Sequence, residues 1–162
     1  MFDFVVRYLR WLARVPGLPQ FFDALLLTST CVFRHSRFVA MQTLETEALR
    51  MPGMRLKVHR FGGIEFVQND GRELGHLHGH GLLDVPVGRR AAGLLIASGR
   101  ARPHHVFPRS KWVSFQIELE TDVPFALELL TLAGESPTLA LQHERVPAMN
   151  IASCNSVSIN IT

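Results

Sequence analysis

The sequence has little of what places a chain in a specialised class. Its 162 residues hold two cysteines, Cys31 and Cys154, so a disulfide scaffold is excluded and a reducing, cytoplasmic compartment is expected. A membrane-spanning helix needs about 20 apolar residues in a row, and no such run occurs. The apolar runs near the start are interrupted by Arg7, Arg10, Arg14, Pro16 and Pro19. No apolar stretch leads from a basic start to a small-residue cleavage site, so a cleaved signal is not expected.

Several catalytic signatures are also missing. The sequence has no glycine-rich phosphate loop carrying Lys and Ser or Thr, and no dinucleotide-binding fingerprint. It has no Cys-x-x-Cys pair and no serine flanked by the glycines of a nucleophile elbow. These absences disfavour a bound nucleotide and acyl-enzyme chemistry.

The composition is that of one ordinary globular domain, with 47% hydrophobic and 19% charged residues. A chain of this length buries roughly 70% of its unfolded surface, so a core forms without disulfides. The positive charge lies early, because residues 1–60 carry nine basic and four acidic side chains, whereas residues 61–134 carry seven and eight. A nucleic-acid binder concentrates basic residues on its folded part, so this nearly neutral middle disfavours nucleic acid as a partner.

Residues 1–15 predict a basic amphipathic helix. Apolar residues recur there at helical spacing, at Phe2, Val5, Val6, Leu9, Leu12 and Ala13. Such a helix either lies in a membrane interface, giving a peripheral membrane contact, or packs on its own domain with its arginines in water. The second alternative is favoured, and nothing in the sequence specifies an oligomer.

The rest of the chain predicts an α+β domain. Helices are expected over residues 21–27, 38–51, 86–98 and 123–133, and strands over residues 56–58, 64–66, 73–78, 101–106 and 112–120. The last strand alternates between apolar and polar residues, which is typical of a strand with one face in water. We therefore expect an antiparallel sheet of about five strands packed against helices. Three regions follow, a helical region at 1–53, a core at 54–134 and an irregular tail at 135–162.

The strongest chemical signal is a set of histidines in two groups. His76 and His78 are two residues apart on an expected strand, so they project from one face with Leu74 beside them, and His80 joins them if the strand continues. His104 and His105 form the second group. Paired imidazoles with the nearby carboxylate of Asp84 have the ligand types for zinc or non-haem iron. They also suit proton transfer near neutral pH.

Each of these residues has a plainer alternative. Asp84 lies two residues before Pro86, where its side chain could cap the helix that begins there. Of His104 and His105, only one can face inward on an extended segment. Trp112 either walls a pocket on the second face of the sheet or packs under a helix.

Three stretches, in this order, resemble the luciferase domain family, which includes the fungal luciferases and many small bacterial proteins. They are ELGHLHGHGLLDVP at 73–86, GRARPHHV at 99–106 and KWVSF at 111–115. The resemblance spans about residues 54–133. The basic, hydrophobic N-terminus is similar to the membrane anchor of the fungal enzymes but is too charged to span a membrane.

The resemblance implies an oxygenase that adds molecular oxygen to a small hydroxylated substrate of the pyrone or enol type. It implies oxygen as co-substrate and no flavin, nicotinamide or metal cofactor, although the histidines leave a metal open. Its candidate base is His78 or His105, with His76 a weaker candidate, Asp84 the orienting partner and Arg109 a stabiliser of negative charge. The expected substrate-binding residues are Leu82, His104, Trp112 and Phe115.

A second function class also fits the order of elements. That order is similar to small α+β domains of the YjbR type, so the alternative is a non-catalytic module that binds a small molecule or nucleic acid. Fold likeness alone does not carry over a substrate. The sequence therefore predicts a site region more firmly than a reaction.

Overall fold

The computed structural model describes residues 17–60 and 62–135. The predicted helix at 1–15 lies outside the described residues, as does the tail after residue 135. Within them the helices are α2 (Leu18–Phe33), α3 (His35–Leu49), α4 (Arg89–Ala97) and α5 (Val123–Gly134). The short 3-10 helix η2 (Glu120–Asp122) leads into α5. Helix α5 ends at Gly134, one residue beyond the predicted range of 123–133.

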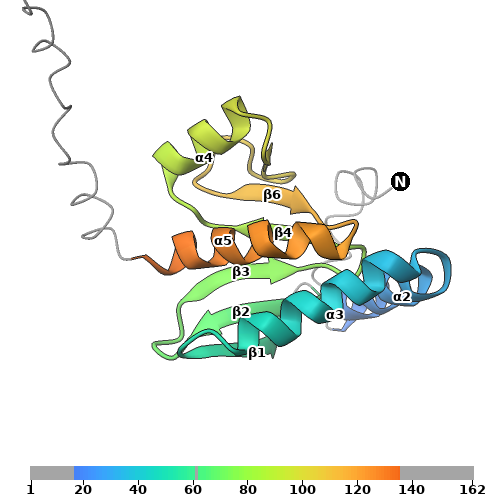
Figure 1. The fold of residues 1–162 in the computed structure, drawn as a ribbon. Coiled ribbons are helices and arrows are strands. Elements are labelled where there is room, and N and C mark those ends of the chain that lie inside the picture. Colours follow the sequence, from blue (N-terminus) through green and yellow to red (C-terminus); the bar gives the residue numbers. More distant parts are fainter. Residues whose placement is uncertain (1–16, 61, 136–162) are drawn as a thin grey trace, which may run out of the picture.

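Six antiparallel strands form one sheet. They are β1 (Met54–Val58), β2 (Ile64–Gln68), β3 (Glu73–Leu77), β4 (Leu82–Val85), β5 (Arg102–Pro103) and β6 (Val113–Gln116). Their order across the sheet is β1-β2-β3-β4-β6-β5, so only the two-residue β5 breaks a simple meander (Figure 1). The predicted α+β fold with an antiparallel sheet is confirmed.

The hydrophobic core lies between the sheet and helices α3 and α5. Phe66, Leu77 and Leu83 project from the strands, and each is at most 1% exposed. Leu44 of α3 and Leu130 of α5 meet them, both fully buried. Helix α3 therefore belongs to the same core as the strands, although it precedes residue 54.

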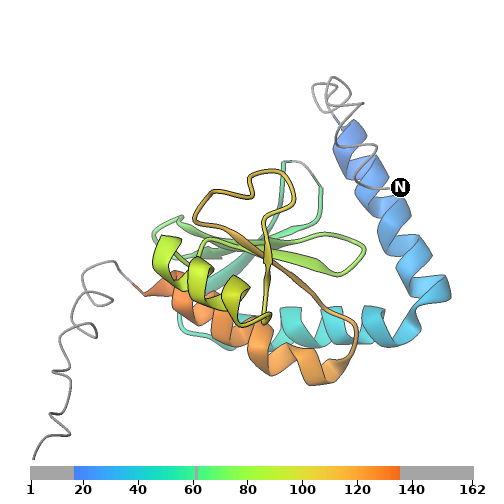
Figure 2. The ribbon, with the colours of Figure 1, turned by 90° about the horizontal axis from the view of Figure 1, so that it is seen from above.

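The other face of the sheet is covered by loops. Register places Glu65, His76, Asp84, Ser114 and Arg102 side by side across five strands. The loop that contains residues 104–112 passes over this row, on the side away from α3 and α5 (Figure 2). Ser114 is 3% exposed, so the prediction that this face of β6 lies in water is wrong at that residue.

The region before α4 differs most from the prediction. Residues 82–85 form β4, the strand that the sequence analysis missed, and α4 begins only at Arg89. Asp84 is therefore paired inside a sheet, and the alternative role as a helix cap is wrong. The N-cap position of α4 is occupied by Gly88, which has no side chain to accept a capping hydrogen bond.

A β-bulge in β3 changes which side chains share a face. Phe66 pairs with Gly75 and Val67 pairs with Glu73, so Leu74 is an extra residue on β3. Leu74 is 3% exposed in the core, on the opposite face from His76, and not beside the histidines as expected. Because the bulge reverses the alternation, Glu73 joins the histidine face instead.

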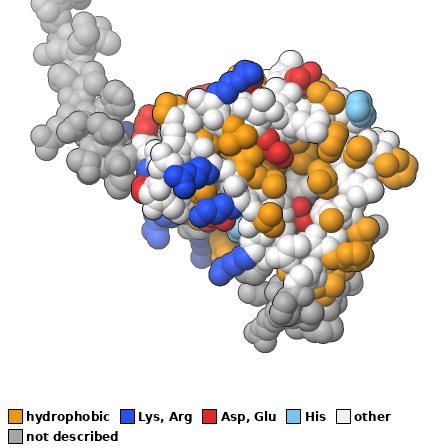
Figure 3. Space-filling view, turned by 90° about the horizontal axis from the view of Figure 1, so that it is seen from below, with side chains coloured by type: hydrophobic (Ala, Val, Ile, Leu, Met, Phe, Trp, Pro, Cys, Tyr) orange, Lys and Arg blue, Asp and Glu red, His pale blue; other side chains and the backbone are white. Residues whose placement is uncertain are grey.

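Helix α2 leaves much of its apolar surface uncovered. Phe21, Val32 and Phe33 are 60%, 65% and 79% exposed. Seen from below, hydrophobic side chains gather over the part of the surface that α2 and α3 form, and basic side chains lie on the other part (Figure 3). Among residues 17–60 and 62–135, no helix is both long enough and apolar enough to cross a membrane.

Candidate functional site

A buried carboxylate lies at the centre of the histidine face. Asp84 is fully buried, and four imidazole nitrogens surround its Oδ2 atom. His78 Nε2 lies 3.2 Å from this oxygen and His105 Nδ1 lies 3.4 Å from it. His76 Nε2 lies at 3.5 Å and His104 Nε2 at 3.8 Å. The structure therefore brings the two histidine groups and Asp84 together, although 23 residues lie between His80 and His104 in the sequence.

The second oxygen of Asp84 has its own donor. The hydroxyl of Ser114, the neighbouring residue on β6, donates a hydrogen bond to Oδ1. Burial alone would raise the pKa of Asp84, but the hydrogen bonds from His105, His76, His78 and Ser114 outweigh it and hold that pKa far below its usual range. Asp84 is thus an anion under all ordinary conditions.

His76 lies between two carboxylates. Its Nδ1 is 2.8 Å from Glu73 Oε1, a contact that the bulge in β3 makes available. Burial disfavours a charge on His76, yet hydrogen bonds to Asp84 and Glu73 raise its pKa to about 9. The bond to His76 in turn lowers the pKa of Glu73. His59 stacks on the His76 ring at 4.3 Å, and burial followed by the charge of His76 lowers the pKa of His59 to about 4.

His78 is held from the side of α2. Asp23 Oδ1 accepts a hydrogen bond from the Gly79 backbone nitrogen at 2.8 Å and lies 4.0 Å from His78 Nδ1. The helix sits directly on this turn, since a Cβ at Gly79 would lie 2.5 Å from the Asp23 carbonyl oxygen and 2.7 Å from the Leu27 nitrogen. Only glycine permits this approach.

His104 organises its own loop. Its Nδ1 accepts hydrogen bonds from the backbone nitrogens of Val106 and Phe107, at 3.0 and 3.1 Å. The neutral ring therefore carries its proton on Nε2, the nitrogen that faces Asp84. Trp112 packs against this ring and against His76, with centroid distances of 5.8 and 5.5 Å. It walls the second face of the sheet and is not packed under a helix.

His105 is the most accessible imidazole around Asp84. Its side chain is 16% exposed, against 11%, 10% and 7% for His76, His78 and His104. With Nδ1 turned to Asp84, the tautomer that the carboxylate favours keeps the proton on Nδ1 and leaves a lone pair on Nε2. His105 therefore has the arrangement of a general base with an orienting acid.

His80 lies at the edge of the cluster. The strand ends at Leu77, but the His80 ring remains 5.8 Å from that of His78. Burial, and then the charges of His78 and Arg37, lower the pKa of His80 to about 4. Its carbonyl oxygen accepts hydrogen bonds from Arg37 Nη1 and Gln116 Nε2, both at 3.0 Å. His80 is thus neutral at neutral pH.

The remaining residues singled out from the sequence fall in different places. Leu82 shares the strand face of Asp84, two residues away on β4. Phe115 lies on the core face instead, where its ring meets Phe125 edge-on at 4.9 Å, because it alternates with Ser114. Arg109 is exposed on the loop that also carries His105.

Three contributors were not identified from the sequence. Ser114 carried a signal, since it lies beside Trp112 in the alternating strand, but the pattern placed it in water. Glu73 reaches the histidine face only because of the bulge in β3, and the alternation of apolar and polar residues does not reveal a bulge. Asp23 lies 55 residues before His78 on a helix that looks unremarkable in the sequence, so no local pattern connects it to the site.

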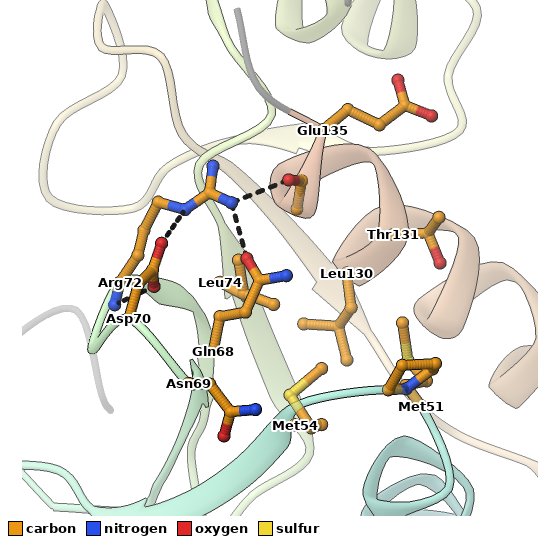
Figure 4. A pocket seen from close by; sticks show the side chains of 12 residues that line it. Met51, Met54, Gln68, Asn69, Asp70, Arg72, Leu74, Leu130, Thr131 and Glu135 are labelled. Atoms are coloured by element: carbon orange, nitrogen blue, oxygen red, sulfur yellow. Dashed lines mark hydrogen bonds and ion pairs between the residues drawn. The ribbon is translucent and has the colours of Figure 1, made fainter.

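A separate hollow lies elsewhere on the molecule. Its volume is about 590 Å³, and its walls include Met51, Met54, Leu74 and Leu130. Arg72 spans one side, donating to Gln68 Oε1 at 2.6 Å and to the Gly134 carbonyl at 2.8 Å (Figure 4). None of the histidines that the structure describes lines this hollow, so it is separate from the Asp84 cluster.

Within the described residues, three groups have ligand atoms close enough together to hold a metal ion. They are His59, Glu73 and His76; His76, His78 and Asp84; and Asp84, His104 and His105. His76 belongs to the first and second groups and Asp84 to the second and third, so the three groups describe one polar centre. That centre has donors for a metal and groups for proton transfer.

The fold and site thus define an α+β domain with a buried carboxylate beneath a cluster of imidazoles. Residues 71–133 match the family described as Luciferase domain, which confirms the resemblance carried by the histidine-containing stretches. Residues 54–70, which the sequence resemblance included, lie outside this match. No curated protein and no solved structure matches the chain.

Proposed function

We propose that this protein is an oxygenase that deprotonates a small hydroxylated substrate, of the pyrone or enol type, at the Asp84–histidine centre. The observation that carries the proposal is the convergence of four imidazoles on one fully buried carboxylate. The match to the Luciferase domain over this segment supports an oxygen-dependent reaction.

The base in this proposal is His105. Its Nε2 takes the hydroxyl proton of the substrate while Asp84, 3.4 Å from Nδ1, stabilises the imidazolium that forms. His78 is the alternative base, but it is less exposed and its Nε2 already faces Asp84. The more accessible imidazole is therefore the better placed of the two.

Deprotonation turns the substrate into an electron-rich enolate. Its nucleophilic carbon forms a bond to one atom of O2, which is reduced to the peroxide level while the carbon is oxidised. The proton held on His105 then passes to the outer oxygen. The hydroperoxide so formed contains every atom of the substrate and of O2. Arg109 lies on the same loop as His105, and we assign its side chain the role of stabilising the negative charge of the enolate.

The test is oxygen uptake by the full chain with a panel of hydroxypyrones and catechols. With an active substrate we expect His105→Gln to lower kcat by about 100-fold or more, because general base catalysis contributes roughly 10²–10⁴-fold. A matched control is His35→Gln, which removes an exposed histidine of α3 and should leave uptake unchanged.

Two results would reject the proposal. One is the absence of oxygen uptake with every compound of the panel. The other is full turnover by both His105→Gln and His78→Gln. Binding of a panel compound without oxygen uptake would identify the chain as the non-catalytic binding module of the alternative prediction.

A further inference from the structure

We infer that His76 Nε2, His78 Nε2 and Asp84 Oδ2 form a binding site for one divalent first-row transition-metal ion. This inference goes beyond the proposed function, which uses His105 as its base. It concerns the protein without substrate, so a measurement of metal binding is sufficient to test it.

A carboxylate lies beside Nδ1 of each of the two imidazoles. Nδ1 of His76 faces Glu73 Oε1 at 2.8 Å, and Nδ1 of His78 faces Asp23 Oδ1 at 4.0 Å. A carboxylate beside Nδ1 orients each ring with Nε2 toward Asp84, and metal-binding histidines usually have such a partner. An ion that binds here displaces the proton that Nε2 otherwise shares with Asp84. In both residues Nε2 is the nitrogen nearest Asp84.

Asp84 is also oriented by a neighbouring group. The Ser114 hydroxyl occupies Oδ1, which leaves Oδ2 for the third ligand position. Asp84 is fully buried, and His76 and His78, taken as whole residues, are 9% and 8% exposed. Their tightly packed surroundings hold the side chains in place, as a metal site requires.

The distances also fit the edges of a coordination polyhedron. Two ligands about 2.1 Å from a metal ion are about 3.0 Å apart at a right angle and about 3.4 Å apart at a tetrahedral angle. The Oδ2 atom lies 3.2 Å from His78 Nε2 and 3.5 Å from His76 Nε2.

The other two imidazoles are excluded from the ligand set for different reasons. His104 carries its proton on Nε2, because its Nδ1 accepts from Val106 and Phe107, so it presents no lone pair to the ion. His105 has the most exposed side chain of the four imidazoles, so it is the least firmly held and we leave it out of the ligand set. Two histidines and one carboxylate then leave open positions, an arrangement typical of non-haem iron(II) sites.

The experiment measures metal binding by the full chain without substrate. After treatment with a chelator, the protein is titrated with Co²⁺, whose visible absorption reports its ligands, and with Fe²⁺ under anaerobic conditions. We expect one ion per chain for the wild type. His76→Gln and Asp84→Asn should each weaken Co²⁺ binding by about 100-fold or more, and Glu73→Gln by about 10–100-fold, as for partners of metal-bound histidine.

His104→Gln is the matched control, because it changes an imidazole at the same carboxylate that is not a ligand. Its Co²⁺ affinity should stay within about threefold of the wild type, given that it removes no bond to the ion. His35→Gln sets the baseline for loss of an exposed histidine. Thermal unfolding of each metal-free variant separates loss of binding from loss of the fold.

The inference is overturned if the folded wild type binds neither ion stoichiometrically, or if His104→Gln weakens binding as much as His76→Gln. Failure of the proposed function gives a different result. Stoichiometric metal binding with no oxygen uptake keeps the metal site and rejects the oxygenase. Undiminished oxygen uptake by metal-free protein, with no binding, rejects the metal site and keeps the oxygenase.

Discussion

The two faces of the sheet are built by different physical means. Leu83 and Asp84 are neighbours on β4 and both are fully buried, yet they face opposite sides. The face of Leu83 is closed by two helices and apolar contact. The face of Asp84 is closed by loops and, beside His78, by α2, and its buried polar groups are stabilised by one another. Burial of apolar area stabilises the first face, whereas the second uses its polar contacts to arrange reactive groups.

The largest effect on stability is expected on the helix face. Leu83→Ala removes a side chain that is packed against the core and leaves a cavity, so the free energy of unfolding should fall by about 2–5 kcal/mol. Urea unfolding in the presence of a chelator measures it. The control Leu94→Ala changes an exposed leucine of α4 and should cost no more than about 0.5 kcal/mol. Equal losses in the two variants would contradict the comparison.

Asp84→Asn should have a smaller effect on stability and a larger one on chemistry. It keeps the shape of the side chain but removes the anion beneath the imidazoles, at a cost of about 1–3 kcal/mol. The same urea experiment measures this loss, and Co²⁺ titration measures the loss of binding. If Asp84→Asn destabilised the metal-free protein more than Leu83→Ala, the polar face would be a main source of stability.

The polar face should also make stability depend on pH. The pKa of His80 is about 4 in the folded protein, below the unfolded value of about 6.5, chiefly because the ring is buried. Between pH 4 and pH 6.5 the unfolded chain therefore binds more protons at His80 than the folded protein does. The contribution of His80 to the free energy of unfolding is complete above pH 6.5 and is lost as the pH falls toward 4. His80→Gln should therefore narrow the difference in Tm between pH 7 and pH 5. An unchanged difference, with His35→Gln as reference, would contradict this.

The smallest effect is expected at the exposed edge of the helix face. The Arg100 guanidinium lies 4.1 Å from the centre of the Phe125 ring, and its Nη2 is 3.0 Å from Glu128 Oε2. Because these groups are exposed to solvent, Arg100→Ala should cost only about 0.5–1 kcal/mol. Thermal unfolding at low and high salt checks this value. A loss as large as that of Leu83→Ala would show that the edge belongs to the core.

Periodicity predicted most elements of this fold because most of them have one apolar face. The hairpin of β1 and β2 and helix α5 were recognised in this way. Strand β4 was missed because Leu82, Leu83 and Val85 give no alternation and the following Pro86 resembles a helix start. Its two buried faces, one apolar and one polar, hide the period of two.

The candidate site was predicted in outline, since two dense groups of histidine within one small domain are conspicuous. Their meeting at Asp84 depends on the register between β3, β4 and β6, which local sequence patterns do not reveal. Glu73 reaches His76 only because of the bulge. Such contacts are set by the packing of distant segments, and pattern analysis sees only neighbours along the chain.

The packing of α2 against Gly79 limits how far this chain can be shortened without loss of the site. The segment that matches the Luciferase domain begins at residue 71, whereas Asp23 belongs to a helix that starts at Leu18. Trimming to the matched segment would strip a carboxylate from His78 and expose the turn beneath it. The smallest fragment that keeps this site intact must therefore include α2, which lies before residue 71, where the family match begins.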